Sequence, residues 1–134
     1  MFAVLDTNVL ISALMNEQSV SAKALVLAMR HFTLLASNET WDELQRKVYS
    51  PKFNAFWDEE ARIVFLTLLA SRTVFVHTTS QITACRDVDD NKFLNLAVDG
   101  GAHLMISGDA DLRVLNPFQS IAILSPADFL QRMG

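Results

Sequence analysis

Four acidic residues lie where predicted strands end or where the helices that follow them begin. Asp6 directly follows the apolar run FAVL, and Asp109 follows the apolar run HLMIS after a single glycine. Asp90 lies at the start of a predicted helix, and Glu43 lies in the first turns of another. Because the carboxyl ends of parallel strands meet at one edge of a sheet, we expect these four carboxylates to converge.

A cluster of four carboxylates is suited to hard metal ions. Like charges at close range repel one another and shift each other's pKa, so the cluster requires cations. Oxygen ligands favour Mg²⁺ or Mn²⁺, whereas zinc sites use histidine and cysteine at characteristic spacings. The three histidines are scattered and lack such spacing: His31, His77 and His103. One or two Mg²⁺ or Mn²⁺ ions are therefore the expected cofactor.

Each acid, taken alone, also has a purely structural interpretation. Asp6 and Asp109 could each cap the helix that follows. Glu43 completes the capping-box pattern Thr40-x-x-Glu43. Asp90 could stabilise the dipole of its helix. Ser, Thr or Asn could do this capping without mutual repulsion, so four acids on one edge favour a shared site, but from the residues alone both interpretations stay open.

Apolar strand patterns alternate with helix patterns along the chain. The predicted strands are residues 2–5, 33–36, 73–77, 103–107 and 121–124. The predicted helices are residues 9–15, 22–30, 40–49, 58–72, 91–98 and 110–115, with a last helix beginning at Ser125 and Pro126. This alternation indicates one α/β domain over residues 1–134, a three-layer α/β/α sandwich with a mainly parallel sheet of roughly five strands. We expect the first strand in the middle of the sheet, which makes Asp6 the central acid.

The helix predicted for residues 58–72 has Ile63, Leu66 and Leu69–Ala70 on one face. The surplus of aromatic and aliphatic residues in PKFNAFWDEEARIVFLTLLA has two interpretations, a surface for a partner or the packing of a long helix against the core. Core packing is the simpler interpretation, so we expect this face to be buried.

Composition argues against several classes of protein. The chain is 51% hydrophobic, which suits a packed core and not a disordered segment. Its apolar runs are far shorter than the roughly 18 residues of a membrane helix. The net charge of −4 argues against a simple basic nucleic-acid binder. No basic segment precedes the first apolar run, and Cys85 is the single cysteine, so we expect a protein of the reducing cytoplasm.

Four sequence motifs resemble those of the PIN-domain ribonucleases: VLDTNVLIS, WDEL, RDVDDNKFLNLA and ISGDADL. They occur in that family's order and spacing over almost the whole chain, and they are most similar to the VapC-like toxins of bacterial toxin–antitoxin pairs. The resemblance implies a parallel α/β/α sandwich and a Mg²⁺- or Mn²⁺-dependent endoribonuclease. It also places the family's acidic quartet on Asp6, Glu43, Asp90 and Asp109.

The resemblance implies further site residues. Asp111 is a candidate fifth metal ligand, while Asn8 and Ser107 match polar positions that support the site. Val88 departs from the family pattern, because relatives often have proline in that position. Basic residues near the acids are candidates for binding the phosphates of RNA: Arg46, Lys47, Lys52, Arg86, Lys92 and Arg113.

The expected reaction is hydrolysis of RNA phosphodiester bonds by water activated at the metal ions. A cognate antitoxin and a homodimer are partners implied by the resemblance alone.

Two other functions are weighed against this one. An aspartyl-phosphate phosphotransfer domain also has an Asp after its first strand, but Asn8 stands where phosphatases of that type need a second Asp. A non-catalytic PIN-fold binding module would be expected to lack one or more of the acids, and all four are present.

Overall fold

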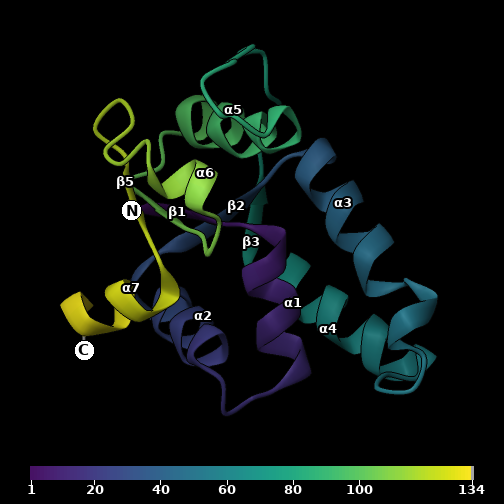
Figure 1. Ribbon diagram of the computed structural model, residues 1–134. Helices are drawn as coiled ribbons and strands as arrows, with labels where there is room; N and C mark the ends of the chain where they lie inside the picture. The colour runs from purple at the N-terminus through teal and green to yellow at the C-terminus, as the bar shows by residue number, and fades with distance from the viewer. Residues whose placement is uncertain (134) are drawn as a thin grey trace.

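The computed structural model describes residues 1–133, which form an α/β fold around a five-stranded sheet (Figure 1). The strands are β1 (Phe2–Leu5), β2 (Thr33–Ala36), β3 (Thr73–Phe75), β4 (Leu104–Ile106) and β5 (Ala122–Leu124). Every neighbouring pair is parallel, and the order across the sheet is β3-β2-β1-β4-β5. The predicted parallel sheet is confirmed, with the first strand at its centre.

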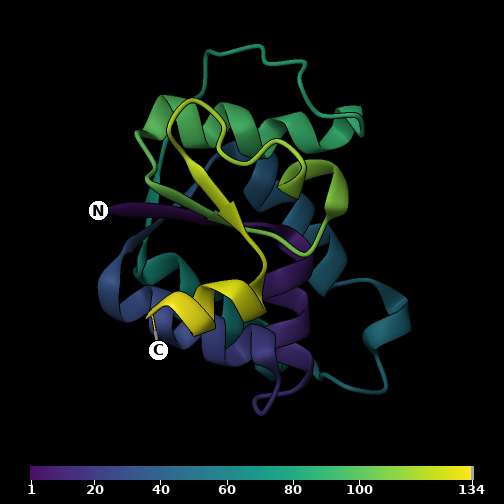
Figure 2. The same cartoon turned by 60° about the vertical axis from the view of Figure 1, so that its left-hand side comes forward.

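Helices connect the strands and cover both faces of the sheet. They are α1 (Thr7–Met15), α2 (Val20–His31), α3 (Asn38–Val48), α4 (Glu59–Ser71), α5 (Asn91–Gly100), α6 (Ala110–Arg113) and α7 (Pro126–Met133). Two short 3₁₀ helices that the sequence did not predict are η1 (Pro51–Phe53) and η2 (Val88–Asp90). Figure 2 shows α5 above the sheet, with α2 and α7 beneath it. Within residues 1–133, no helix has both the length and the apolar character needed to cross a bilayer.

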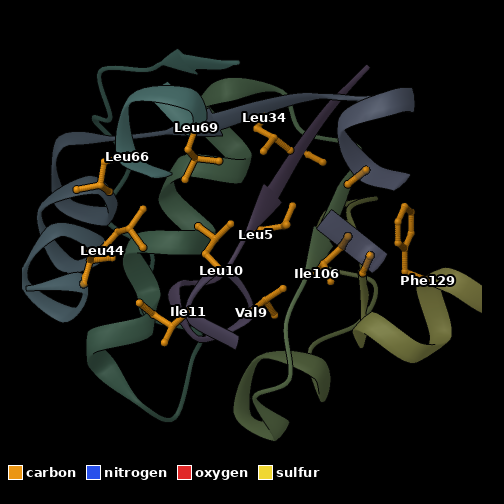
Figure 3. Close-up of a cluster of buried hydrophobic side chains, with 14 of the residues drawn as sticks. Leu5, Val9, Leu10, Ile11, Leu34, Leu44, Leu66, Leu69, Ile106 and Phe129 are labelled. Carbon is orange, nitrogen blue, oxygen red and sulfur yellow. The ribbon is translucent and has the colours of Figure 1, made fainter. Parts of the chain in front are cut away.

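Successive side chains of β1, β2, β4 and β5 pack into two separate cores, one on each face of the sheet. Ala3 and Leu5 of β1 join the core on the side of α1 and α2, whereas Val4 joins the core beneath α5. This alternation is the two-residue period of a strand. Leu5, Leu10 of α1 and Leu34 of β2 belong to the first core and lie near its middle in Figure 3. The central strands β1 and β4 are apolar throughout because both of their faces are covered, whereas the edge strand β3 has no buried residue.

The register of the sheet places Asp6 beside Ser107. Leu5 of β1 pairs with Ile106 of β4, and the backbone N–H of Asp6 donates to the carbonyl of Ile106 at 3.0 Å. Asp6 directly follows β1 and Ser107 directly follows β4. The two residues therefore lie side by side at the carboxyl edge of the sheet. Open parallel sheets bind their ligands at this edge.

The buried face of α4 differs from the predicted one. Ile63 is 49% exposed, whereas the adjacent Arg62 is only 7% exposed. The guanidinium Nε of Arg62 donates to the carbonyl of Val48 at 2.9 Å, so its charge is satisfied inside the protein. Leu66 and Leu69 are buried, as predicted. The prediction for Ile63 was wrong, because the long stem and fixed donors of Arg62 fill the space between α4 and α3.

Candidate active site

Asp6 is buried at the junction of β1 and α1, with 4% of its surface exposed. Its Oδ1 accepts a hydrogen bond from the backbone N–H of Val9 at 2.9 Å and so caps α1. Its Oδ2 accepts a hydrogen bond from the hydroxyl of Ser107. Burial is the main reason that the pKa of Asp6 is raised; the hydrogen bonds from Ser107 and Val9 oppose the rise, and the charge of Asp109 adds to it. Asp6 is thus a helix cap and also lies within reach of a second acid.

Ser107 connects Asp6 with Asp109. It is completely buried, its hydroxyl donates to Asp6, and its Oγ accepts from the backbone N–H of Asp109 at 3.0 Å. Asp109 in turn caps α6, because its Oδ1 accepts from the backbone N–H of Asp111 at 2.9 Å. Ser107 therefore lies between two of the predicted acids, where a supporting residue is expected.

Asp90 and Asp109 share a hydrogen bond between their carboxyl groups. Burial, this hydrogen bond and the charges of Asp109, Asp87 and Glu43 raise the pKa of Asp90 to about 7. The same hydrogen bond is the main reason that the pKa of Asp109 is lowered. With a pKa of about 7, Asp90 carries the shared proton in about half of the molecules at pH 7 and in most of them at lower pH.

Asp87 completes a group of three carboxylates with Asp90 and Asp109. One oxygen from each residue lies within 4.8 Å of the other two. Asp87 is not among the predicted site residues, although three of the four residues from Asp87 to Asp90 are acids, a signal visible in the sequence. Three carboxylates this close fit a hard divalent cation, whose ligands are oxygens. We refer to these residues as the three-acid group.

The loop that carries Asp87 is fastened to α5 by side-chain hydrogen bonds. The buried Asn91 accepts from the backbone N–H of Cys85 at 2.8 Å. One turn further along α5, Asn95 accepts from the backbone N–H of Ile82 at 2.9 Å. These two bonds fix the course of the loop, and as a result Asp87 lies next to the start of α5.

Glu43 does not serve as a capping residue. The N-cap of α3 is Ser37, whose Oγ accepts from the backbone N–H of Thr40 at 3.2 Å. The hydroxyl of Thr40 accepts in return from the backbone N–H of Ser37 at 2.9 Å. The capping box is therefore Ser37–Thr40, and the pairing of Thr40 with Glu43 was wrong. Glu43 lies one turn further into the helix, where its carboxylate is free for other contacts.

The carboxylate of Glu43 is buried and paired on both of its oxygens. Its Oε2 accepts a hydrogen bond from the hydroxyl of Thr7, a residue that the sequence analysis missed. Its Oε1 lies 2.9 Å from Nζ of Lys92. The charge of Glu43 acts on Asp90, so Glu43 faces the other acids, although it is not a member of the three-acid group.

Two other predicted basic residues act on the acids. The charge of Lys47 opposes the rise in the pKa of Asp6, and its Nζ donates to Oδ1 of the exposed Asn8 at 3.3 Å. The charge of Arg113 contributes to the lowered pKa of Asp109. Asn8 thus touches the site through Lys47.

Within residues 1–133, the remaining predicted basic residues, Arg46, Lys52 and Arg86, form no ion pair with the acids. Nζ of Lys52 lies over the ring of Phe53 in η1, 5.1 Å from its centroid. Arg86 is exposed in the loop before Asp87. An open groove between α3 and α5 runs beside the cluster and is lined by Glu39, Asp42, Arg46, Ile82, Thr83, Val88, Asp89, Asn91, Lys92 and Asn95.

Solved structures share this fold. VapBC-1 from nontypeable Haemophilus influenzae has a TM-score of 0.64 at 17% identity, covering 95% of this chain and 99% of that chain. VapBC2 from Rickettsia felis, bound to a DNA fragment from their promoter, has a TM-score of 0.63 at 15% identity, covering 92% and 97%. PAE2754 from Pyrobaculum aerophilum has a TM-score of 0.63 at 13% identity, covering 98% and 88%.

Sequence comparisons identify the protein family. The uncharacterized protein MJ1680 of Methanocaldococcus jannaschii is 38% identical over 111 residues, which cover 81% of this chain and 71% of that protein. The sequence profile of the PIN domain matches residues 3–111, a span that includes all four predicted acids. The chain therefore belongs to the PIN domain family.

Proposed function

We propose that this chain is an endoribonuclease that hydrolyses RNA phosphodiester bonds with the help of Mg²⁺ or Mn²⁺. The observation that carries the proposal is the three-acid group, whose carboxylate oxygens lie within 4.8 Å of one another at the carboxyl edge of the sheet. Membership of the PIN domain family supports nuclease chemistry at this edge. The acids lie at an open surface, beside the groove between α3 and α5.

The residues proposed to hold one or two ions are the acids of this edge: Asp6, Glu43, Asp87, Asp90, Asp109 and, as a further candidate, Asp111. A bound ion would supply Lewis acidity, activating water and neutralising charge on the phosphate. The protein fixes the ligands in advance, since Ser107 holds Asp6 and Thr7 holds Glu43. With a pKa of about 7, Asp90 is protonated in about half of the free protein at pH 7, and positive charge entering the site would favour release of that proton.

RNA is the proposed substrate because several basic residues lie beside an otherwise acidic site. Lys47 and Arg113 act electrostatically on Asp6 and Asp109, and Arg46 lines the adjacent groove. Together with Lys52 and Arg86, they would contact phosphates on either side of the bond to be cleaved. Such contacts position the strand and carry no base preference.

We further propose that the chain is a cytoplasmic toxin held inactive by a cognate antitoxin, and that residues 1–134 act as a single nuclease domain. The support is that two structures with this fold are of VapBC proteins. A homodimer is the second proposed assembly, and it rests on the family resemblance.

An RNA cleavage assay with and without metal tests the proposed activity. Excess EDTA should abolish cleavage, and Mn²⁺ or Mg²⁺ should restore it. Asp90→Asn should remain inactive after metal is restored. The control is Asp58→Asn, because Asp58 caps the distant α4 by accepting from Ala61 at 2.7 Å, and Asn caps equally well. Robust cleavage in EDTA, or full activity of Asp90→Asn, would contradict the proposal.

A further inference from the structure

Lys92 lies inside the acidic cluster and not at its rim. Its Nζ is 2.9 Å from Oε1 of Glu43 and 3.2 Å from Oδ2 of Asp89. The side chain of Lys92 is 14% exposed and that of Glu43 is 8% exposed, so this ion pair is largely removed from solvent. Buried pairs of this kind are held in place strongly, because removing one partner leaves an uncompensated charge.

The position of Lys92 on its helix is unfavourable without these acids. Lys92 is the second residue of α5, and a positive charge at a helix N-terminus opposes the helix dipole. The ammonium is therefore stabilised in this position by the carboxylates that it contacts. A residue needed only to attract RNA could lie at many exposed positions, so the buried position points to a role within the cluster.

Both carboxylate oxygens of Glu43 already have a partner that donates to them. Thr7 donates to Oε2 and Lys92 contacts Oε1. The three-acid group, in contrast, has only one internal hydrogen bond between carboxyl groups, that of Asp90 with Asp109. An ammonium thus pairs with the Glu43 side of the cluster, whereas within residues 1–133 no ion pair reaches the three-acid group.

We propose that Lys92 takes the place of a second divalent ion, so that the chain binds one ion at Asp87, Asp90 and Asp109 while Lys92 neutralises Glu43. Lys92 is then a positioning residue, since it acts by holding Glu43. This inference rests on the proposed function in requiring that a divalent ion binds, and it narrows that proposal to one ion with Glu43 outside the set of ligands. It differs from the expectation that Lys92 contacts RNA, because the lysine would have to leave two carboxylates to do so.

Counting Mn²⁺ ions bound per chain tests the inference without any cleavage assay. Equilibrium dialysis, with free Mn²⁺ measured by electron paramagnetic resonance, should give one ion for the wild-type protein. Lys92→Met removes the ammonium from Glu43 and should give two ions. Lys92→Arg keeps the charge and should give one. Lys23→Met makes the same charge change on the exposed face of α2 and should also give one.

Two further measurements support the count, and the first of them does not require Lys92→Met to fold. Glu43→Gln should still bind one ion with the same stoichiometry, because Glu43 is not a ligand of that ion. The increase in Tm caused by saturating Mn²⁺ should be larger for Lys92→Met than for Lys92→Arg, since only the former has an unpaired Glu43.

The outcomes separate this inference from the proposed function. Two ions in the wild-type protein, loss of ion binding in Glu43→Gln, or one ion in a folded Lys92→Met would overturn the role of Lys92 and leave the metal-dependent nuclease standing. A wild-type protein that binds no Mn²⁺ would overturn both.

Discussion

The carboxyl group of Asp90 donates a hydrogen bond to the carboxylate of Asp109, two residues that reach the same point from η2 and from the loop after β4. Such a bond needs a proton that an ordinary aspartate has lost at neutral pH. Burial, together with the hydrogen bond to Asp109 and the charge of Asp109, raises the pKa of Asp90 from 3.8 to about 7. The folded protein therefore binds a proton that the unfolded chain releases.

We predict that the metal-free protein becomes less stable as the pH rises from about 5 to about 8. In this range the folded state holds more protons than the unfolded state, so raising the pH favours unfolding. Asp6, whose pKa is also raised, acts in the same direction. The lowered pKa of Asp109 matters only at more acidic pH.

Thermal melts in EDTA across this pH range check the prediction. The Tm of the wild-type protein should fall with rising pH, and Asp90→Asn should show a shallower fall because it cannot ionise. Asp58→Asn, which removes an exposed carboxylate far from Asp90, should keep the wild-type slope. Equal slopes for wild type and Asp90→Asn would show that Asp90 is not protonated in the fold.

A second prediction concerns protons released on metal binding. Asp90 must ionise to act as a ligand, so Mn²⁺ binding at pH 7 should release about half a proton per ion. Calorimetric titrations in buffers with different ionisation enthalpies measure this number. Asp90→Asn should bind Mn²⁺ more weakly and release close to none. A wild-type value near zero would mean that the ion binds away from Asp90.

The third prediction concerns Ser107, which holds Asp6 and Asp109 together. Ser107→Ala should lower RNA cleavage by roughly 10- to 100-fold, the usual effect of removing a residue that orients metal ligands. It should also lower the free energy of unfolding by about 1–3 kcal/mol, because a buried N–H loses its acceptor. Ser37→Ala is the control, since Ser37 is equally buried but caps α3. It should lose stability and keep its activity; a similar loss of cleavage in both variants would contradict a specific role for Ser107.

The fourth prediction concerns the basic residues around the site. Each phosphate contact with single-stranded RNA contributes about 0.7 to the slope of log affinity against log salt. Alanine substitutions should reduce this slope by about that amount for each residue that binds phosphate: Arg46, Lys47, Lys52, Arg86 and Arg113. Lys23→Ala on α2 should leave the slope unchanged. If a substitution changes neither the affinity for RNA nor its salt dependence, the substituted residue does not bind RNA phosphates.

The approach of Asp6, Asp90 and Asp109 to one another was predictable, because Asp6 and Asp109 follow apolar runs and Asp90 directly precedes a helix. Glu43 acts on Asp90 from the middle of α3. The spacing of apolar residues differs between strands and helices, so it shows where each strand ends. All strands of a parallel sheet end at its carboxyl edge. The central position of β1 follows from the same topology. These features depend on the backbone, which local sequence patterns describe well.

The features that could not be predicted depend on individual side-chain contacts. Asp87 lies close to Asp90 because Asn91 and Asn95 bind the loop before Asp87 to α5. The periodic patterns of a sequence do not predict such side-chain hydrogen bonds. Likewise, the pairing of Lys92 with Glu43 joins α5 to α3, two helices far apart in the sequence.

The last prediction tests Asp87, the acid that only the structure identified. Asp87→Asn removes the charge but keeps the cap of η2, because the amide oxygen can still accept from the backbone N–H of Asp89, now 3.1 Å from Oδ1 of Asp87. The affinity for Mn²⁺ should fall by roughly tenfold or more. The pKa of Asp90 should also fall, because the charge of Asp87 is one of the causes that raise it.

The matched control is Asp89→Asn in the same turn, because Asp89 is 76% exposed and lies outside the three-acid group. It makes the same charge change and should keep nearly wild-type Mn²⁺ affinity. Calorimetry measures the affinity, and a carboxyl titration followed by NMR measures the pKa of Asp90. Equal losses of affinity in the two variants would indicate a general effect of charge in this turn. A selective loss in Asp87→Asn would indicate direct ligation, because only a ligand distinguishes two acids so close in the chain.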